Sequence, residues 1–138
     1  MKVYTGGTYD LFHWGHARFL MRSARFGPVT VGLNTDEFVT LYRGRPPVWN
    51  YEQRKEMLLA CRYVSEVFPQ ADHDSRPNVL RSCAGLVTAG SDWGPEKYGA
   101  QTSLTNEWLE SMEVELMFLP YTKGISSTLL REVPRGGE

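Results

Sequence analysis

The chain has 138 residues, 41% of them hydrophobic, which is enough for one compact domain with a core and leaves little room for a second. The formal net charge is −1, so the overall balance indicates neither a nucleic acid nor a membrane as partner. No apolar run approaches the roughly 20 residues of a membrane-spanning helix, and the first residues lack the pattern of a secretory signal. We therefore expect a single cytoplasmic domain over residues 1–138.

The predicted elements alternate along the chain between strand and helix. Short runs of strand-forming residues predict strands over 3–5, 29–33, 64–68, 86–89 and 114–119. Helical spacing of apolar residues and helix-start signals predict helices over 17–24, 34–41, 51–62, 77–83, 103–112 and 126–133. Glycine and proline predict a loop over 43–50, and Pro69 is expected to end the third strand. The tail, 134–138, is expected to fray.

This alternation predicts parallel strands joined by helical crossovers, and therefore a Rossmann-like doubly wound α/β sheet. Ligands of such sheets bind beyond the carboxyl ends of the strands. The first strand ends near Gly6, so the residues that follow are expected at the site. The loops that begin at Gly90 and Pro120 leave other strands at the same edge.

Cysteines and tryptophans are expected mainly in the core. Cys61 and Cys83 fall in stretches predicted as buried helix, where a free cysteine behaves as a small hydrophobic residue. A disulfide is not expected in a cytosolic protein. Trp14, Trp49 and Trp108 are also interpreted as packing residues, with Trp49 the exception to consider because it lies in the loop.

The segment 7–16 carries the strongest chemical signal. Glycines after a strand let backbone N–H groups approach a phosphate, and Gly15 and His16 are expected to open the next helix, where the dipole favours an anion. His13 and His16 can aim at one spot and donate hydrogen bonds to phosphate oxygens that gain charge in a transition state. Taken alone, such a pair also fits two incidental histidines or a metal site, although no cysteine or third histidine lies nearby.

Four segments resemble, in order, the motifs of the cytidylyltransferase family of nucleotidyltransferases. They read Gly-Thr-Tyr-Asp-Leu-Phe-His-Trp-Gly-His over 7–16, Arg-Tyr-Val-Ser-Glu-Val over 62–67, Gly-Ser-Asp-Trp over 90–93 and Gly-Ile-Ser-Ser-Thr over 124–128. The resemblance covers nearly the whole chain and is strongest to the glycerol-3-phosphate branch. It implies transfer of CMP from CTP to a small phosphorylated alcohol, first of all glycerol 3-phosphate, by direct displacement of pyrophosphate. It also implies Mg²⁺ with CTP and a cytoplasmic homodimer.

The same resemblance implies three groups of site residues. His13 and His16 would act on the α-phosphate, with Arg43 and Arg45 as catalytic cations in a mobile loop. The implied nucleotide contacts are Thr8, Tyr9, Gly15, Arg62, Asp92, Trp93, Gly124, Ile125, Ser126, Ser127 and Thr128. The implied acceptor contacts are Asp10, Arg43 and Arg76, and no metal ligand is expected in the chain.

Several of these residues also have ordinary structural interpretations. The loop arginines fit solvated surface, Asp92 fits a turn, and 124–128 fits an ordinary helix cap. Two departures from the glycerol-3-phosphate branch stand out: Tyr121 replaces an arginine, and 94–105 differs in sequence. An adenylyltransferase of the same fold and a catalytically silent nucleotide-binding module therefore remain as alternatives.

Overall fold

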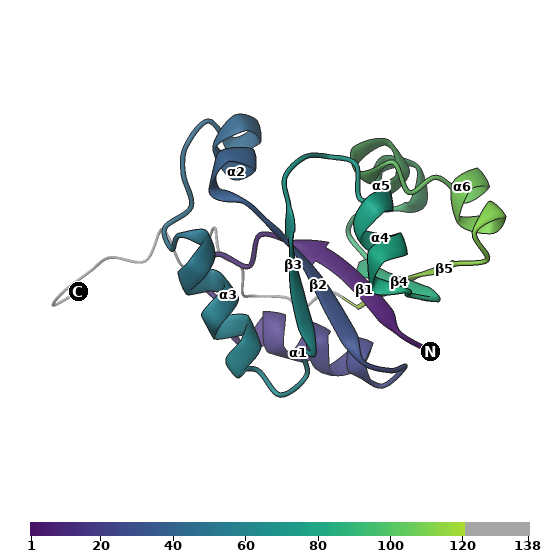
Figure 1. Ribbon diagram of the computed structural model, residues 1–138, viewed down its shortest axis with the longest axis horizontal. Helices are drawn as coiled ribbons and strands as arrows, with labels where there is room; N and C mark the ends of the chain where they lie inside the picture. Colours follow the sequence, from purple (N-terminus) through teal and green to yellow (C-terminus); the bar gives the residue numbers. More distant parts are fainter. Residues whose placement is uncertain (121–138) are drawn as a thin grey trace, which may run out of the picture.

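The computed structural model describes residues 1–120. Its centre is a five-stranded parallel sheet in the order β3-β2-β1-β4-β5, which confirms the Rossmann-like α/β prediction (Figure 1). The strands are β1 (Val3–Gly7), β2 (Val29–Asn34), β3 (Glu66–Gln70), β4 (Leu86–Gly90) and β5 (Glu115–Leu119). The helices are α1 (Trp14–Ala24), α2 (Asp36–Arg43), α3 (Tyr51–Ala60), α4 (Arg76–Ser82), α5 (Pro95–Thr102) and α6 (Asn106–Ser111). The predictions over 126–133 and 134–138 lie outside the described residues.

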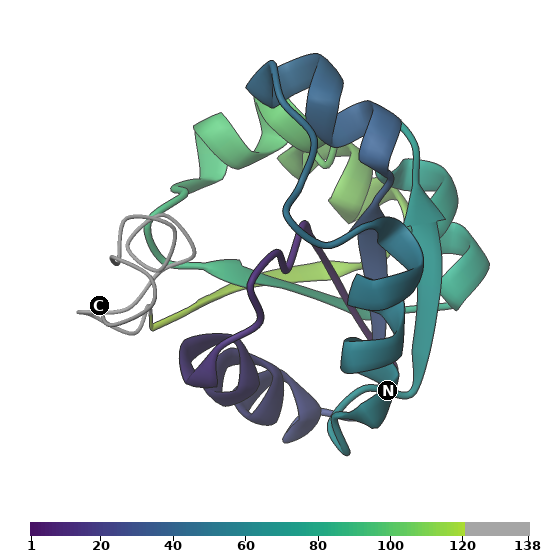
Figure 2. The same cartoon turned by 90° about the vertical axis from the view of Figure 1, so that its left-hand side faces the viewer.

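Helices cover both faces of the sheet, and each face has its own core. Side chains alternate along a strand, so Val3 and Tyr4 of β1 face opposite layers. Leu20 of α1 and Leu58 of α3 pack in the Val3 layer, whereas residues of α4, α5 and α6 pack in the Tyr4 layer. Figure 2 shows the sheet between α1 on one side and α5 and α6 on the other. None of the helices within residues 1–120 is long and apolar enough to cross a membrane.

Three predicted elements differ from the structure. Helix α1 begins at Trp14, ahead of the apolar spacing over 17–24 and of Gly15 and His16, which were expected to open it, because the His13 side chain caps it. The helix predicted over 103–112 is present as the shorter α6, and the preceding α5 was not predicted; the two are separated where Ser103 adopts a left-handed φ of 65°. Strand β3 continues through Pro69, because proline is tolerated near the end of an edge strand.

The core prediction fails for two residues. Cys83 is exposed in the left-handed C-cap of α4, whereas Cys61 is partly buried at the C-cap of α3. Trp14 is 54% exposed, and the Arg18 guanidinium lies 5.4 Å from the centroid of its ring. Both residues sit at helix ends, where helical spacing does not decide which side chains turn inward.

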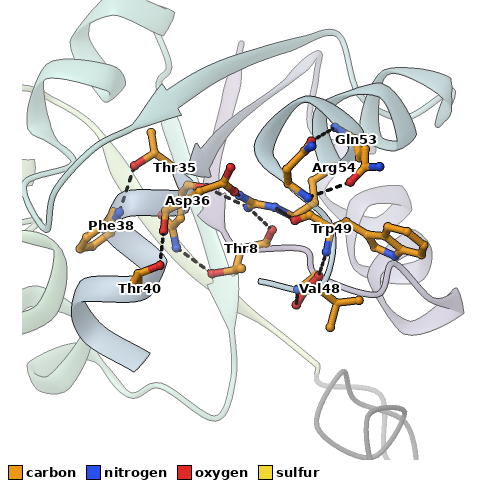
Figure 3. A network of polar contacts seen from close by, with 12 residues as sticks. Thr8, Thr35, Asp36, Phe38, Thr40, Val48, Trp49, Gln53 and Arg54 are labelled. Atoms are coloured by element: carbon orange, nitrogen blue, oxygen red, sulfur yellow. Dashed lines mark hydrogen bonds and ion pairs between the residues drawn. The ribbon is translucent and has the colours of Figure 1, made fainter. Parts of the chain in front are cut away.

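A fully buried arginine ties together the segments around the carboxyl edge of the sheet. The Arg54 side chain, from α3, is 0% exposed. Its guanidinium donates to the backbone oxygens of Thr8, Asn34 and Trp49 at 2.8 to 2.9 Å. It also forms a 2.8 Å ion pair with Asp36 at the start of α2 (Figure 3). One cation therefore fixes the ends of two central strands, the start of α2 and the loop before α3.

Asp10 provides a second anchor for the same loop. Its carboxylate accepts hydrogen bonds from the backbone N–H groups of Val48 and Trp49, at 2.8 and 3.1 Å. Asn50 then caps α3 by accepting from the Gln53 N–H at 2.9 Å. The second half of the loop between α2 and α3 is thus bound to the segment that follows β1.

Replacement of Arg54 by leucine should lower the free energy of unfolding by about 2 kcal/mol or more, because three backbone carbonyl groups would lose a buried donor. Urea unfolding followed by circular dichroism measures this change. Arg62→Leu is the matched control, since Arg62 is exposed, and it should change the free energy by less than about 0.5 kcal/mol. Equal stability of Arg54→Leu and wild type would contradict the assigned role.

Candidate active site

The carboxyl ends of the strands open into one pocket of about 500 Å³. Its walls come from the segments that follow β1, β2, β3 and β4, and Pro120 follows β5. This is the place where a doubly wound sheet binds its ligand. The expected site residues that line this pocket are Thr8, Tyr9, Asp10, His13, Gly15, His16, Arg43, Asp92 and Trp93.

Other expected residues are not brought to this pocket. Arg62 lies near the opposite edge of the sheet. It belongs to the short segment before β3, in which the Ser65 N–H donates a hydrogen bond to the backbone oxygen of Val29 at the start of β2. Arg76 turns to Asp74, with nitrogen–oxygen distances of 2.8 and 2.9 Å, and is absent from the described pocket wall. Arg45 is exposed in the loop and also lies outside that wall. Arg62 and Arg76 thus do not line the described pocket, and the contacts expected of them stay predictions.

The motif over 124–128, with Gly124, Ile125, Ser126, Ser127 and Thr128, lies outside the described residues, as does Tyr121.

His13 and His16 are held by the backbone at the start of α1. Nδ1 of His13 accepts from the N–H groups of Gly15 and His16, at 3.1 and 3.4 Å, and so caps the helix. Nδ1 of His16 accepts in return from the His13 N–H at 3.2 Å. The two rings stack with centroids 3.7 Å apart. Because Nδ1 of each ring is an acceptor, a neutral imidazole carries its proton on Nε2, which is left to donate to a ligand.

Burial keeps both rings neutral near pH 7. Desolvation lowers the pKa of His13 below its ordinary value. For His16 desolvation and the neighbouring His13 lower the pKa to about 3, while Asp10 acts in the opposite direction. The pair therefore offers two uncharged N–H donors rather than two cations.

Aromatic packing and a constrained backbone hold the His16 ring in place. Tyr9 and Phe12 lie against His16, with ring centroids at 5.1 and 5.4 Å. Tyr9 and Leu11 both adopt left-handed φ, 50° and 51°, a costly conformation that the surrounding contacts must enforce. A Cβ at Gly7 would lie 2.8 Å from the Tyr9 ring. The buried Tyr9 side chain thus supports the His16 ring.

Asn34, Phe38 and Tyr42 are among the wall residues that sequence reasoning missed. The Thr8 hydroxyl lies 2.5 Å from the Tyr42 hydroxyl and accepts from Nδ2 of Asn34 at 2.9 Å. Phe38 lines the pocket from the same helix as Tyr42. Two signals were present in the sequence: Asn34 ends a buried strand, and Phe38 and Tyr42 are four residues apart on one helical face.

Charged groups of both signs line the pocket. Within the described wall, Asp10, Asp72 and Asp92 provide carboxylates, and Arg43 is the sole lysine or arginine. Residues 1–120 contain no group of three or more histidine, cysteine, aspartate or glutamate side chains that could hold a metal ion. The donors of residues 1–120 alone do not make up a protein-held metal centre.

Comparison with known proteins agrees with this geometry. The model of the family described as cytidylyltransferase-like matches residues 4–133. The glycerol-3-phosphate cytidylyltransferase of Bacillus subtilis is 34% identical over 95% of both chains. The ethanolamine-phosphate cytidylyltransferase of Arabidopsis thaliana is 37% identical over 64% of this chain and 22% of its own length.

A solved structure, the lipopolysaccharide core biosynthesis protein of Thermoplasma volcanium, has the same fold. It is 17% identical with a TM-score of 0.70, covering 91% of this chain and 98% of its own. The family match spans the pocket residues and the histidine pair of this chain. The chain therefore belongs to the cytidylyltransferase-like family and is a nucleotidyltransferase.

Proposed function

We propose that this enzyme transfers CMP from CTP to a small phosphorylated alcohol, with glycerol 3-phosphate as the first candidate acceptor. The observation that carries the proposal is the histidine pair, whose Nδ1 atoms are occupied by the backbone and whose Nε2–H groups are free to act on one phosphate. The glycerol-3-phosphate relative supports the acceptor, because its match extends over 95% of both chains.

The proposed reaction is a direct displacement at the α-phosphorus of CTP. An oxygen of the acceptor phosphate forms the new P–O bond, the bond to the β-phosphate oxygen breaks, and pyrophosphate leaves with that electron pair. Donors that are already aimed at the reacting phosphate stabilise the charge that develops on its oxygens. His13 and His16 supply these donors, and CTP is taken up as its magnesium complex, in which the metal belongs to the substrate.

We assign the other wall residues to three roles: contact with the nucleotide, contact with the phosphates, and positioning of the loop before α3. We assign the nucleotide to the Thr8 and Gly15 backbone, to Asp92 and Trp93, and to residues 124–128, as the resemblance implied. Arg43 lines the pocket from the end of α2, and we assign it to the phosphates. Asp10 accepts two backbone hydrogen bonds from the loop before α3, so we assign it to loop positioning in place of the direct acceptor contact expected from the sequence.

A panel of nucleotides and acceptors tests the proposal. Wild-type protein with CTP, Mg²⁺ and glycerol 3-phosphate should release pyrophosphate and form CDP-glycerol, whereas ATP should give no release. Phosphoethanolamine and phosphocholine extend the panel to the acceptors named in other relatives. Release with ATP alone would favour the adenylyltransferase alternative. Tight CTP binding in calorimetry without release for any acceptor would favour the silent module.

His13→Asn separates catalysis from helix capping. Asparagine is among the best N-cap residues, so α1 should form as in the wild type. The variant lacks the Nε2–H donor, and kcat should fall by a factor of about 100 or more, as when one transition-state donor is removed. Pyrophosphate release measures kcat, and far-ultraviolet circular dichroism checks the fold. Wild-type kcat in a folded His13→Asn protein would refute the assigned role.

Burial of His16 predicts a loss of stability in acid. Its folded-state pKa of about 3 lies below the ordinary value of 6.5, so the unfolded chain takes up the proton first as the pH falls. Protonation of His16 therefore does not affect the free energy of unfolding above about pH 6.5. Between that pH and pH 5 it should lower the free energy of unfolding by about 1 to 2 kcal/mol. Urea unfolding at both pH values measures it, with His16→Asn as the control that lacks this component. Equal pH slopes for the two proteins would contradict a buried neutral ring.

A further inference from the structure

A buried polar network crosses the sheet from β1 to β3 beneath the pocket. The Tyr4 side chain is 0% exposed, and its hydroxyl donates to Oε1 of Gln70 at 3.1 Å. Nδ2 of Asn78, in α4, donates to the same oxygen at 2.9 Å. Burial raises the pKa of the Tyr4 phenol to about 12, so the hydroxyl stays protonated and remains a donor.

Gln70 also holds the loop between β3 and α4 by hydrogen bonds. Its Nε2 donates to the backbone oxygens of Asp72 and Asp74, at 2.6 and 2.9 Å. Together with the two bonds to Oε1, these contacts satisfy all four positions of a buried amide. The loop residues Asp72, His73 and Ser75 form part of the pocket wall, so the network fixes one end of the pocket.

The network depends on a glycine in the intervening strand. Tyr4 belongs to β1 and Gln70 to β3, and β2 lies between them. A Cβ at Gly32 of β2 would lie 1.8 Å from the Tyr4 hydroxyl oxygen and 2.6 Å from the adjacent ring carbon. The phenol reaches across β2 because Gly32 has no side chain.

The strand order assigns this end of the pocket to the acceptor, an inference that rests on the proposed function. The reacting phosphate lies at the histidine pair after β1, and the proposed nucleotide residues Asp92 and Trp93 follow β4. Strand β3 lies on the other side of β1, two strands away. The attacking phosphate must approach the α-phosphorus opposite to the leaving group, and the β3 end of the pocket is the part that the nucleotide assignment leaves free.

We propose that Tyr4, Gln70 and Gly32 form a positioning device for the acceptor: they hold the 71–75 loop at the β3 end of the pocket and thereby set the affinity for the phosphorylated alcohol. These residues act through the loop, so their loss should change the acceptor step and spare the nucleotide.

Two nearly isosteric substitutions test this proposal. Tyr4→Phe removes one hydroxyl, and Gln70→Glu replaces the two N–H donors that hold the loop with a carboxylate oxygen. Steady-state kinetics should show the KM for the acceptor raised about 5-fold in Tyr4→Phe, the scale of one hydrogen bond, and more in Gln70→Glu. The KM for CTP should stay within about 2-fold of the wild-type value, because the loss of even one weak contact to CTP would change it by more. The acceptor is the panel member that the wild type uses best.

Tyr51→Phe is the matched control. The Tyr51 hydroxyl is buried and has no hydrogen-bond partner among residues 1–120, and Tyr51 does not line the pocket. Its removal should leave both KM values unchanged. If Tyr4→Phe and Gln70→Glu also leave the acceptor KM unchanged, or raise both KM values equally, the positioning role is overturned.

A double variant separates positioning from stability. Gly32→Ala should lower the melting temperature, because the new methyl group collides with the Tyr4 ring, and Gly32→Ala/Tyr4→Leu should recover part of that loss by removing the phenol. The acceptor KM of the double variant should nevertheless stay raised, since the hydroxyl is gone. A recovered melting temperature with a wild-type acceptor KM would overturn the proposal. A wild-type enzyme that releases no pyrophosphate with any acceptor would overturn the proposed function, and this inference with it.

Discussion

Capping of helix α1 by its own histidines is the interaction on which the site depends. A helix start leaves backbone N–H groups without partners, and here imidazole nitrogens take the place of the usual hydroxyl or carboxylate oxygens. The consequence is chemical as well as structural. Each ring gives its Nδ1 to the backbone, which fixes both the orientation of the ring and the nitrogen that bears the proton. The hydrogen bonds that form the first turn of α1 therefore also orient the two imidazole rings and place their protons on Nε2.

The electrostatics of the pocket follow from this arrangement. Protonated histidines would attract a triphosphate more strongly already in the ground state, and binding strength that is present before the reaction does not raise kcat. Neutral N–H donors at a helix start interact most with the oxygens on which charge increases during the displacement. Burial against Tyr9 and Phe12 keeps His16 in this neutral form. In the proposed reaction, Arg43 and a cation bound to the substrate phosphates would balance the overall charge.

The sequence predicted the sheet, the edge that binds ligand and the histidine pair, because each depends on local pattern: strand-forming runs, a glycine turn and a three-residue spacing. It did not predict which side chains far apart in the chain meet. Arg54 resembles any charged residue on an amphipathic helix, yet it is fully buried because three backbone carbonyls and Asp36 converge on it. Arg62 belongs to a motif of the family, and only the topology shows that it lies near the opposite edge of the sheet. The break at Ser103 depends on a single left-handed residue that no periodicity marks.

A parallel sheet delivers each strand end to the pocket as a separate loop. The ladder pairing of the strands stops at Gly7, Asn34, Gln70 and Gly90, and side chains such as Asp10 and Arg54 then tie the segments beyond them to one another. A change of length in one of these segments would therefore also have to keep the side-chain contacts that reach it from its neighbours.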